Sequence, residues 1–217
     1  MEALIRSTAQ DREVQELLAQ YECPIPFHEV RTRFIGSVAM PFMTHAPLNV
    51  VKDLWNGKLP EFPDVDHRNE FMGALISGLW LRLSQHQNRN SPFRLCRMNS
   101  APTRNYISIL TLMRRQEIDG FICGLFRDEK SLDLPEKASR NLDILMETHD
   151  LFSGIEALTS DRDAVFDEKR LRTTLRNTQD LTLQAERAIH TLILAYVRAR
   201  KFNLPLFTNE RADFQLH

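Results

Sequence analysis

Glycine and cysteine are scarce in this sequence, and each shortage excludes a class of protein. Only seven of the 217 residues are glycine, and few runs alternate apolar with polar residues, so a β-rich fold has weak support. The three cysteines, Cys23, Cys96 and Cys123, are odd in number and widely spaced, which argues against a disulfide framework. None belongs to a C-x-x-C pair, which excludes the usual zinc-finger arrangement. We expect reduced, mostly packed thiols in a cytoplasmic protein.

An excess of charge and a long apolar run are also missing. The 28 basic and 29 acidic residues nearly cancel to a formal net charge of -1, which argues against a general nucleic-acid binder. No uncharged apolar run is long enough for a transmembrane helix, and the N-terminal MEALIRSTAQ does not have the pattern of a signal peptide. The sequence therefore predicts no contact with a membrane.

Catalytic motifs are missing too. The sequence contains neither a G-x-S-x-G elbow nor an H-E-x-x-H pair, and its glycines form no phosphate-binding loop. We therefore predict no catalytic residue, no cofactor and no enzymatic activity.

Apolar residues at helical spacing are what the sequence does contain. Prolines and polar loops divide them into separate segments, of which the last is the longest. Asp66 and Asp133 are placed to cap helices, and Pro135 fits a first turn. The pattern predicts an all-α, multi-helix bundle with a helical domain at 1–160 and a long C-terminal helix with its tail at 161–217. The predicted helices span residues 2–21, 27–40, 47–55, 67–87, 102–125, 135–149 and 167–201.

The last predicted helix carries an apolar stripe in steps of four and three, which is heptad-like. Thr178 and Thr182 stand where a strong zipper places leucine, so we expect this helix to dock on the bundle or on a partner. The candidate partner-binding residues are Leu171, Leu175, Ile189, Leu192 and Tyr196. In the following KFNLPLF, the core or partner-facing residues are Leu204, Leu206 and Phe207.

One acidic cluster leaves a metal site open. PDVDHRNE brings four polar residues into one loop and helix start, where they act either as metal ligands or as capping and dipole-stabilising groups. These residues are Asp64, Asp66, His67 and Glu70.

Basic side chains form two clusters that could contact phosphates. The first lies on the polar loop with Phe93 and Tyr106 as aromatic neighbours, and it contains Arg89, Arg94, Arg97 and Arg104. The second opens the last helix among several aspartates, which favours a solvated surface of mixed charge, and it contains Lys169, Arg170, Arg172 and Arg176.

The segment EIDGFICGLF places Gly120 and Gly124 on one face of a predicted helix. Glycine costs about 1 kcal/mol relative to alanine inside a helix, so the pair needs a reason. We expect a close helix–helix contact there, with Phe121 packed beside it and Cys123 as a packed thiol.

The same segment contributes to a family resemblance. FIGSVAMPF and PLNVVKDLWNG, with Pro41, Pro47 and the turn Trp55-Asn56-Gly57, together with DGFICGLF, resemble the YecA/YgfB-like proteins over roughly residues 28–158. Those proteins usually have tryptophan where Glu117 stands, and the cysteine-rich zinc-binding tail of some members is missing. The resemblance implies an all-helical bacterial domain of poorly defined function, often dimeric, with no established catalytic site.

These observations favour a non-catalytic helical interaction or regulatory protein that acts through a protein partner or through self-association. A nucleic-acid-associated regulator that uses one of the basic clusters is the alternative. A metal-dependent enzyme centred on the acidic cluster is the third hypothesis.

Overall fold

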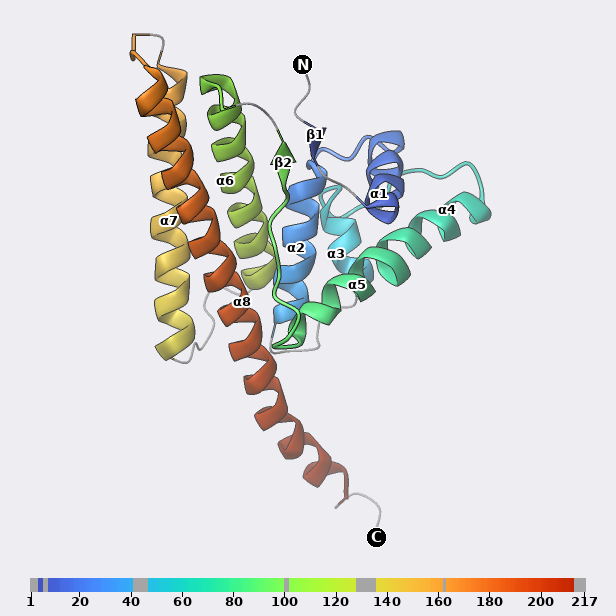
Figure 1. Ribbon diagram of the computed structural model, residues 1–217. Coiled ribbons are helices and arrows are strands. Elements are labelled where there is room, and N and C mark those ends of the chain that lie inside the picture. Colours follow the sequence, from blue (N-terminus) through green and yellow to red (C-terminus); the bar gives the residue numbers. More distant parts are fainter. Residues whose placement is uncertain are drawn as a thin grey trace.

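Helices make up almost all regular structure in the computed structural model of the chain, and the fold is all-α (Figure 1). The structure describes residues 4–5, 8–40, 47–99, 102–127, 136–161 and 163–212. Two short strands, β1 (Leu4–Ile5) and β2 (Met98–Asn99), pair antiparallel. The helices are α1 (Ala9–Gln20), α2 (Phe27–Ala39), α3 (Pro47–Asp53), α4 (Val65–Met72), π-helical η1 (Gly73–Trp80), α5 (Leu81–Ser84), 3-10 helix η2 (Gln85–Gln87), α6 (Arg104–Phe126), α7 (Glu136–Ser160) and α8 (Glu168–Ala212).

The helices pack as two groups on either side of α2. Figure 1 shows α6, α7 and α8 side by side, with α2 next to α6, while α1, α3 and the run from α4 through α5 lie on the other side of α2. The lower end of α8 continues past the other helices. Within the described part of the chain, no helix combines the length and the apolarity needed to cross a bilayer.

One continuous core joins these groups. Large side chains from α2, α4, α6, α7 and α8 are each exposed by less than 2% and belong to the same cluster. Burial of such aromatic groups is the main stabilising term of a helical fold, because each removes a large apolar area from water. The side chains are Phe34, Phe71, Phe121, Phe152 and Tyr196.

The apolar stripe of α8 is covered by the chain itself. Ile189 and Leu192 are 0% exposed and Tyr196 is 1% exposed, all inside the main core. Leu171 and Leu175 are partly buried against a second, smaller cluster that contains Tyr106 and Met113. The first three residues are therefore core residues and not a free partner surface, which corrects the interpretation of the stripe from its spacing alone.

The buried face of the same helix accommodates threonines because each threonine hydroxyl finds a hydrogen-bond acceptor within the helix. Thr174, Thr178 and Thr182 are all buried, and each hydroxyl donates to the carbonyl four residues earlier at 2.8 Å. A buried hydroxyl that makes this bond avoids the cost of an unpaired polar group. The short side chains let α8 lie close to α7 and α6.

Glycines bring the backbones of α2 and α6 into direct contact. A Cβ built on Gly36, Gly120 or Gly124 would lie closer than 3.0 Å to an atom of the facing helix, for example the Arg33 carbonyl oxygen opposite Gly124. The Ser37 hydroxyl on α2 donates to the Gly124 carbonyl at 3.1 Å across this contact. The glycine pair of EIDGFICGLF therefore lies at the contact between α2 and α6, with Phe121 buried beside it.

Cys123 does not pack as expected, since its thiol is exposed. The buried stripe of this part of α6 consists of Gly120, Phe121, Gly124 and Leu125, and a residue at position 123 points to the opposite side of the helix. Cys23 is half-buried and Cys96 is buried.

Several helix ends differ from the sequence prediction. The first helix begins at Ala9, where Thr8 forms a capping box with Asp11, and α4 is capped by Asp64 instead of Asp66. Helix α7 continues to Ser160, because Phe152 and Thr159 beyond the expected end at His149 are buried by its neighbours. Asp133, Pro135 and the side chains of Leu204, Leu206 and Phe207 lie outside the described residues.

The α2–α6 contact predicts opposite effects for two glycine-to-alanine changes. Gly124→Ala should lower the free energy of unfolding by about 1–3 kcal/mol, because the new methyl group overlaps the Arg33 carbonyl. Gly154→Ala on α7 is the control: nothing lies within 4 Å of its Cβ, so higher helix propensity should raise stability by up to about 1 kcal/mol. Urea denaturation measures both values, and equal stability of the two variants would contradict the close contact.

Candidate anion-binding surface

Residues 92–97, here called the arginine segment, run extended along one face of the molecule and end at β2 (Figure 1). Side chains alternate along it, with Phe93 and Leu95 buried at 0% and 2% exposure and with Arg94 exposed between them. Cys96 is also buried and Arg97 is exposed. The alternation up to Leu95 is the normal pattern of extended backbone that covers a core, and it directs Arg94 to the surface. It breaks at Leu95 and Cys96, which are both buried, and Arg97 then returns to the surface.

Two buried carboxylates hold the backbone of the arginine segment. Glu186 on α8 accepts the Leu95 N–H at 3.0 Å, and Glu117 on α6 accepts the Cys96 N–H at 2.7 Å. Glu186 is 1% exposed and Glu117 is 0% exposed. A buried carboxylate is stable only when it is paired and hydrogen-bonded, so these two residues fix the position of the segment.

Glu117 has a buried guanidinium as its counter-charge. Arg114, one turn earlier on α6, is 2% exposed and forms an ion pair with Glu117. The same guanidinium donates to the Cys96 carbonyl and to the Thr182 hydroxyl on α8, the latter at 3.2 Å. The group therefore ties the segment to both helices.

Glu186 has two surface arginines as counter-charges. Arg94 lies 2.7 Å and Arg97 lies 2.8 Å from its carboxylate, and their side chains are 55% and 47% exposed. One carboxylate cannot neutralise two guanidinium groups, so positive charge remains at this surface.

Arg31 on α2 extends the positive surface. Its guanidinium donates to the Cys96 Sγ at 2.9 Å and lies 5.4 Å from the centroid of the Phe93 ring. Burial raises the pKa of Cys96 to about 11, so Arg31 contacts a neutral thiol.

A hollow of about 480 Å³ adjoins Arg31, between α1, α2 and the end of α5. Arg82 lines it and is held by Asp11 at 2.7 Å and by Gln10 at 2.8 Å. His86 also lines it, and its Nδ1 donates to the Ser91 carbonyl at 2.9 Å. Burial lowers the pKa of His86, and the positive charge of Arg31 lowers it further, so the imidazole is neutral at pH 7.

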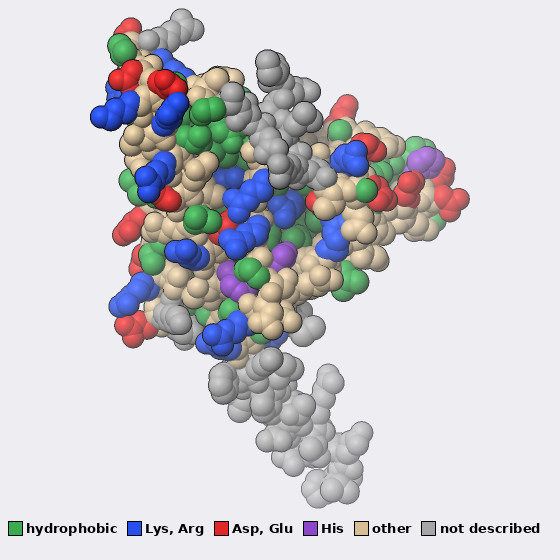
Figure 2. All heavy atoms as spheres, viewed as in Figure 1, with side chains coloured by type: hydrophobic (Ala, Val, Ile, Leu, Met, Phe, Trp, Pro, Cys, Tyr) green, Lys and Arg blue, Asp and Glu red, His purple; other side chains and the backbone are tan. Residues whose placement is uncertain are grey.

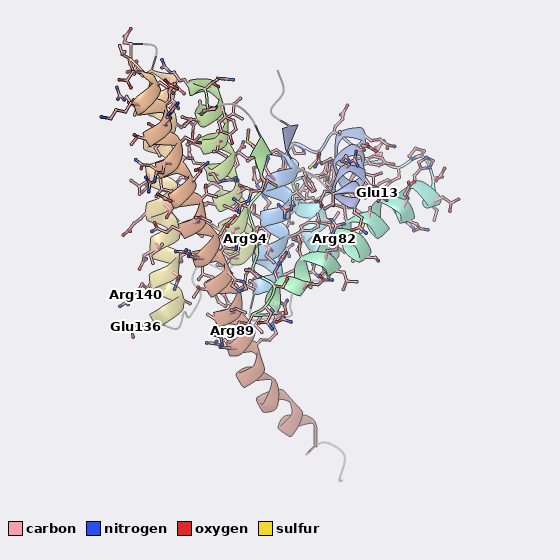
Figure 3. All side chains as sticks on the ribbon, in the orientation of Figure 1. Glu13, Arg82, Arg89, Arg94, Glu136 and Arg140 are labelled. Atoms are coloured by element: carbon pink, nitrogen blue, oxygen red, sulfur yellow. The ribbon has the colours of Figure 1, made fainter. Side chains whose placement is uncertain are left out.

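Figure 2 shows these basic groups as one patch. Lys and Arg side chains gather at the centre of this face, over the region between α8 and α2, with His at its lower border. In Figure 3 Arg94 lies at the centre of the face, Arg82 toward α5 and Arg89 at the lower end. Phe93 and Tyr106, the aromatic neighbours of the first basic cluster, are buried, and Tyr106 donates to the Met98 carbonyl at 3.2 Å.

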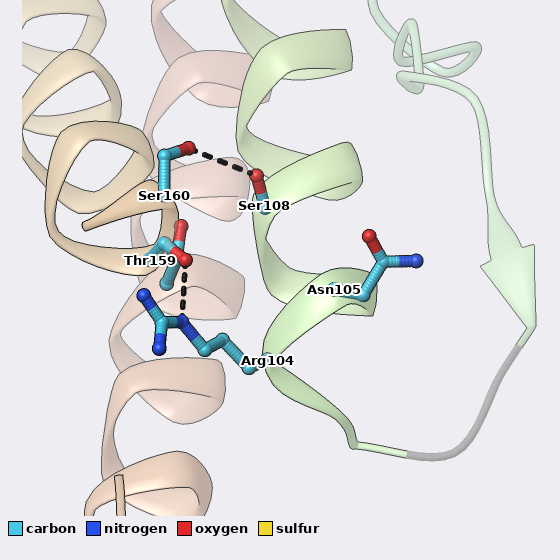
Figure 4. Close-up of a pocket in the computed structure, with 5 residues that line it drawn as sticks. All are labelled: Arg104, Asn105, Ser108, Thr159 and Ser160. Carbon is cyan, nitrogen blue, oxygen red and sulfur yellow. Dashed lines mark hydrogen bonds between the residues drawn. The ribbon is translucent and has the colours of Figure 1, made fainter. Parts of the chain in front are cut away.

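Arg104 does not belong to this patch, because it caps the end of α7. Its guanidinium donates to the carbonyls of Thr159 at 2.6 Å, of Ala164 at 3.2 Å and of Asp161. These bonds satisfy carbonyls that a helix end leaves unpaired. Figure 4 shows the hollow beside it, where Ser108 and Ser160 face each other. The guanidinium of Arg104 beside this hollow is therefore bonded to the backbone.

Two residues of the basic cluster at the start of α8, Arg170 and Arg172, make local contacts. Arg172 pairs with Glu168, and Arg170 donates to the Val165 carbonyl at 2.9 Å while it packs on the Phe166 ring. This arrangement is the mixed-charge surface that the neighbouring acids indicated.

The acidic cluster forms a helix cap. Asp64 accepts the His67 N–H at 2.9 Å and contacts the His67 ring at 2.7 Å, which raises the pKa of His67. Among the described residues, no group of three or more His, Cys, Asp or Glu side chains is placed to hold a metal ion. Asp64 and His67 thus meet each other, while Asp66 and Glu70 do not join them in a ligand set.

Sequence reasoning identified the surface arginines but missed their buried carboxylates. Glu117 drew attention only as a departure from the family pattern, and Glu186 only as a helical pair with His190. One signal was available for Glu186, because it directly follows Ala185 of the buried stripe of α8, where a carboxylate needs a partner.

The buried pair predicts a large loss of stability on neutralisation. Glu117→Gln leaves the Arg114 guanidinium buried without a counter-charge and should lower the free energy of unfolding by about 3–5 kcal/mol. Glu168→Gln is the matched control, since Glu168 and Arg172 are 79% and 73% exposed, and it should cost less than about 1 kcal/mol. Urea unfolding checks both, and equal losses would show that the Arg114–Glu117 pair is hydrated.

His86 predicts a loss of stability in acid. Its folded pKa lies below the ordinary 6.5, so protonation favours the unfolded chain. The stabilising contribution is complete above the unfolded pKa and declines as the pH falls through the lower folded pKa. The free energy of unfolding, measured between about pH 7.5 and pH 5, should fall more steeply for wild type than for His86→Gln. Parallel curves would contradict this assignment.

Comparisons of the chain with protein-family models, with curated proteins and with solved structures give no match. The resemblance to the YecA/YgfB-like proteins thus stays a prediction from the quoted motifs.

Proposed function

We propose that this chain is a non-catalytic helical interaction protein and that its arginine segment binds acidic side chains of a protein partner. The observation that carries the proposal is the exposure of Arg94 and Arg97 above a carboxylate that is itself 1% exposed. A buried anchor beneath two half-exposed guanidinium groups holds them in fixed positions, which reduces the entropy lost on binding.

The arginines keep donors for a partner. Arg94 and Arg97 each use one terminal nitrogen on Glu186. A guanidinium has several N–H groups in a planar fork, so the remaining ones can bind a second carboxylate. Arg31 adds a further positive charge beside them.

A protein partner suits this surface better than a nucleic acid. Single-stranded nucleic acids bind by stacking on exposed aromatic rings, whereas Phe93 and Tyr106 are buried here. In the second basic cluster Arg172 is paired with Glu168, and the net charge of the chain is -1. The electrostatic term that drives non-specific nucleic-acid binding is therefore small.

The titratable groups beneath this surface have structural partners, which supports a binding function over a catalytic one. Cys96 is held as a buried thiol with a pKa of about 11, and Glu117 and Glu186 spend their oxygens on backbone N–H groups and arginines. All three cysteines are free, which suits the reducing cytoplasm that the proposal assumes.

An acidic peptide provides the test. A fluorescein-labelled oligoglutamate should bind wild-type protein at low salt, and Arg94→Gln/Arg97→Gln should weaken binding by about tenfold or more, since each charge-assisted hydrogen bond contributes about 1.5–3 kcal/mol. Fluorescence anisotropy measures the affinity. Arg172→Gln, which removes an exposed arginine paired elsewhere, should bind like wild type.

A second variant guards against unfolding of the first. Arg94→Lys/Arg97→Lys keeps Glu186 neutralised but loses the planar fork, so it should fold and bind the peptide several-fold more weakly. Unchanged affinity in both variants would contradict the proposal. Tighter binding of an oligonucleotide of equal charge would favour the nucleic-acid alternative instead.

A further inference from the structure

The hollow between α1, α2 and the end of α5 is a separate feature that shares only Arg31 with the surface proposed above. Arg31, Arg82, Asp11 and His86 line it, and the core residues Leu79 and Leu83 lie beneath it, 1% and 3% exposed. Its volume of about 480 Å³ lies within the range of small-molecule sites, which combine an apolar lining with a few convergent polar groups.

Arg82 has its charge balanced within the wall of this hollow. It donates to the Asp11 carboxylate at 2.7 Å and to the Gln10 side-chain oxygen at 2.8 Å, so its charge is matched and its orientation is fixed from α1. The side chains of Arg82 and Asp11 are only 29% and 18% exposed. The ion pair is thus partly shielded from solvent and forms a rigid wall.

Arg31 is the cation available to a ligand. Its hydrogen-bond partners among the described residues are neutral, namely the Cys96 thiol at 2.9 Å and the Arg94 carbonyl at 3.5 Å. The negative charges of Glu117 and Asp11 both act on Arg31. Since Arg114 pairs with Glu117 and Arg82 pairs with Asp11, and His86 is neutral, Arg31 is the positive charge left in excess. Contact with the Phe93 ring holds the Arg31 guanidinium in place from behind.

We propose that this hollow binds one carboxylate of a small organic acid, with the carboxylate on Arg31. The charge excess of one matches a monoanion, whereas a phosphate dianion would bring a second negative charge that no cation of the hollow compensates. A planar carboxylate also fits the guanidinium fork in a bidentate contact. Either a free acid or the terminal carboxylate of a peptide offers this chemistry.

Hexanoate is the probe, and NMR of the His86 imidazole is the readout. Hexanoate should shift the His86 signals saturably, with a dissociation constant of about 1 mM or below, while hexanol should not shift them. Arg31→Gln should weaken binding by about tenfold or more, and Arg172→Gln should not change it. Arg31→Lys keeps the positive charge but loses the planar guanidinium, so it should also weaken binding. This variant tests the carboxylate site if Arg31→Gln does not fold.

The outcomes are distinct. Absence of saturable shifts, equal shifts in Arg31→Gln or Arg31→Lys, or tighter binding of inorganic phosphate would overturn the carboxylate site. An acetylated tripeptide with a free C-terminal carboxylate, compared with its C-terminal amide, identifies a peptide as the source if it binds more tightly than hexanoate, and a free acid if it binds less tightly. Arg94→Gln/Arg97→Gln should leave hexanoate binding unchanged, so failure of this site and failure of the proposed function are separately visible.

Discussion

The backbones of α2 and α6 touch because three glycines leave no side chain between them, and this contact sets the positions of Arg31 and Glu117 relative to each other. Arg31 extends from α2 and Glu117 from α6, and both reach Cys96 of the arginine segment. A wider separation of the two helices would leave one of these groups short of its partner. Close packing in the core thus fixes the electrostatics of the surface, since packed interiors transmit small displacements.

Helices were predictable from the sequence because periodicity is a local property, whereas their ends depend on neighbours. Apolar spacing located α2 and α8, but Gly154 and the polar residues around it suggested that α7 ends near His149. The helix continues because Phe152 is fully buried by tertiary packing, which overrides weak local propensity. Cys123 shows the same limit, since a short apolar run does not reveal which face of its helix meets α2.

The arginines of the basic surface could be predicted from the sequence, but their buried partner could not. Arg94 and Arg97 were recognisable as a basic cluster, but Glu186 lies 92 residues from Arg94 in the sequence and no local pattern joins them. The zipper-like spacing of the α8 stripe left docking on the bundle and docking on a partner as alternatives, and Ile189, Leu192 and Tyr196 lie in the chain's own core. Spacing predicts that a face is buried but not what buries it.

The separation between Arg94 and Glu186 also orders events during synthesis. At about 5–20 residues per second, the ribosome needs roughly 5–20 s after adding Arg94 to add Glu186, which follows 92 residues later. Until then Leu95 and both arginines lack their buried acceptor, and only the Cys96 N–H can already meet its carboxylate on α6. The nascent chain therefore carries a positive segment that is held at Cys96 alone until α8 supplies Glu186 near the end of translation.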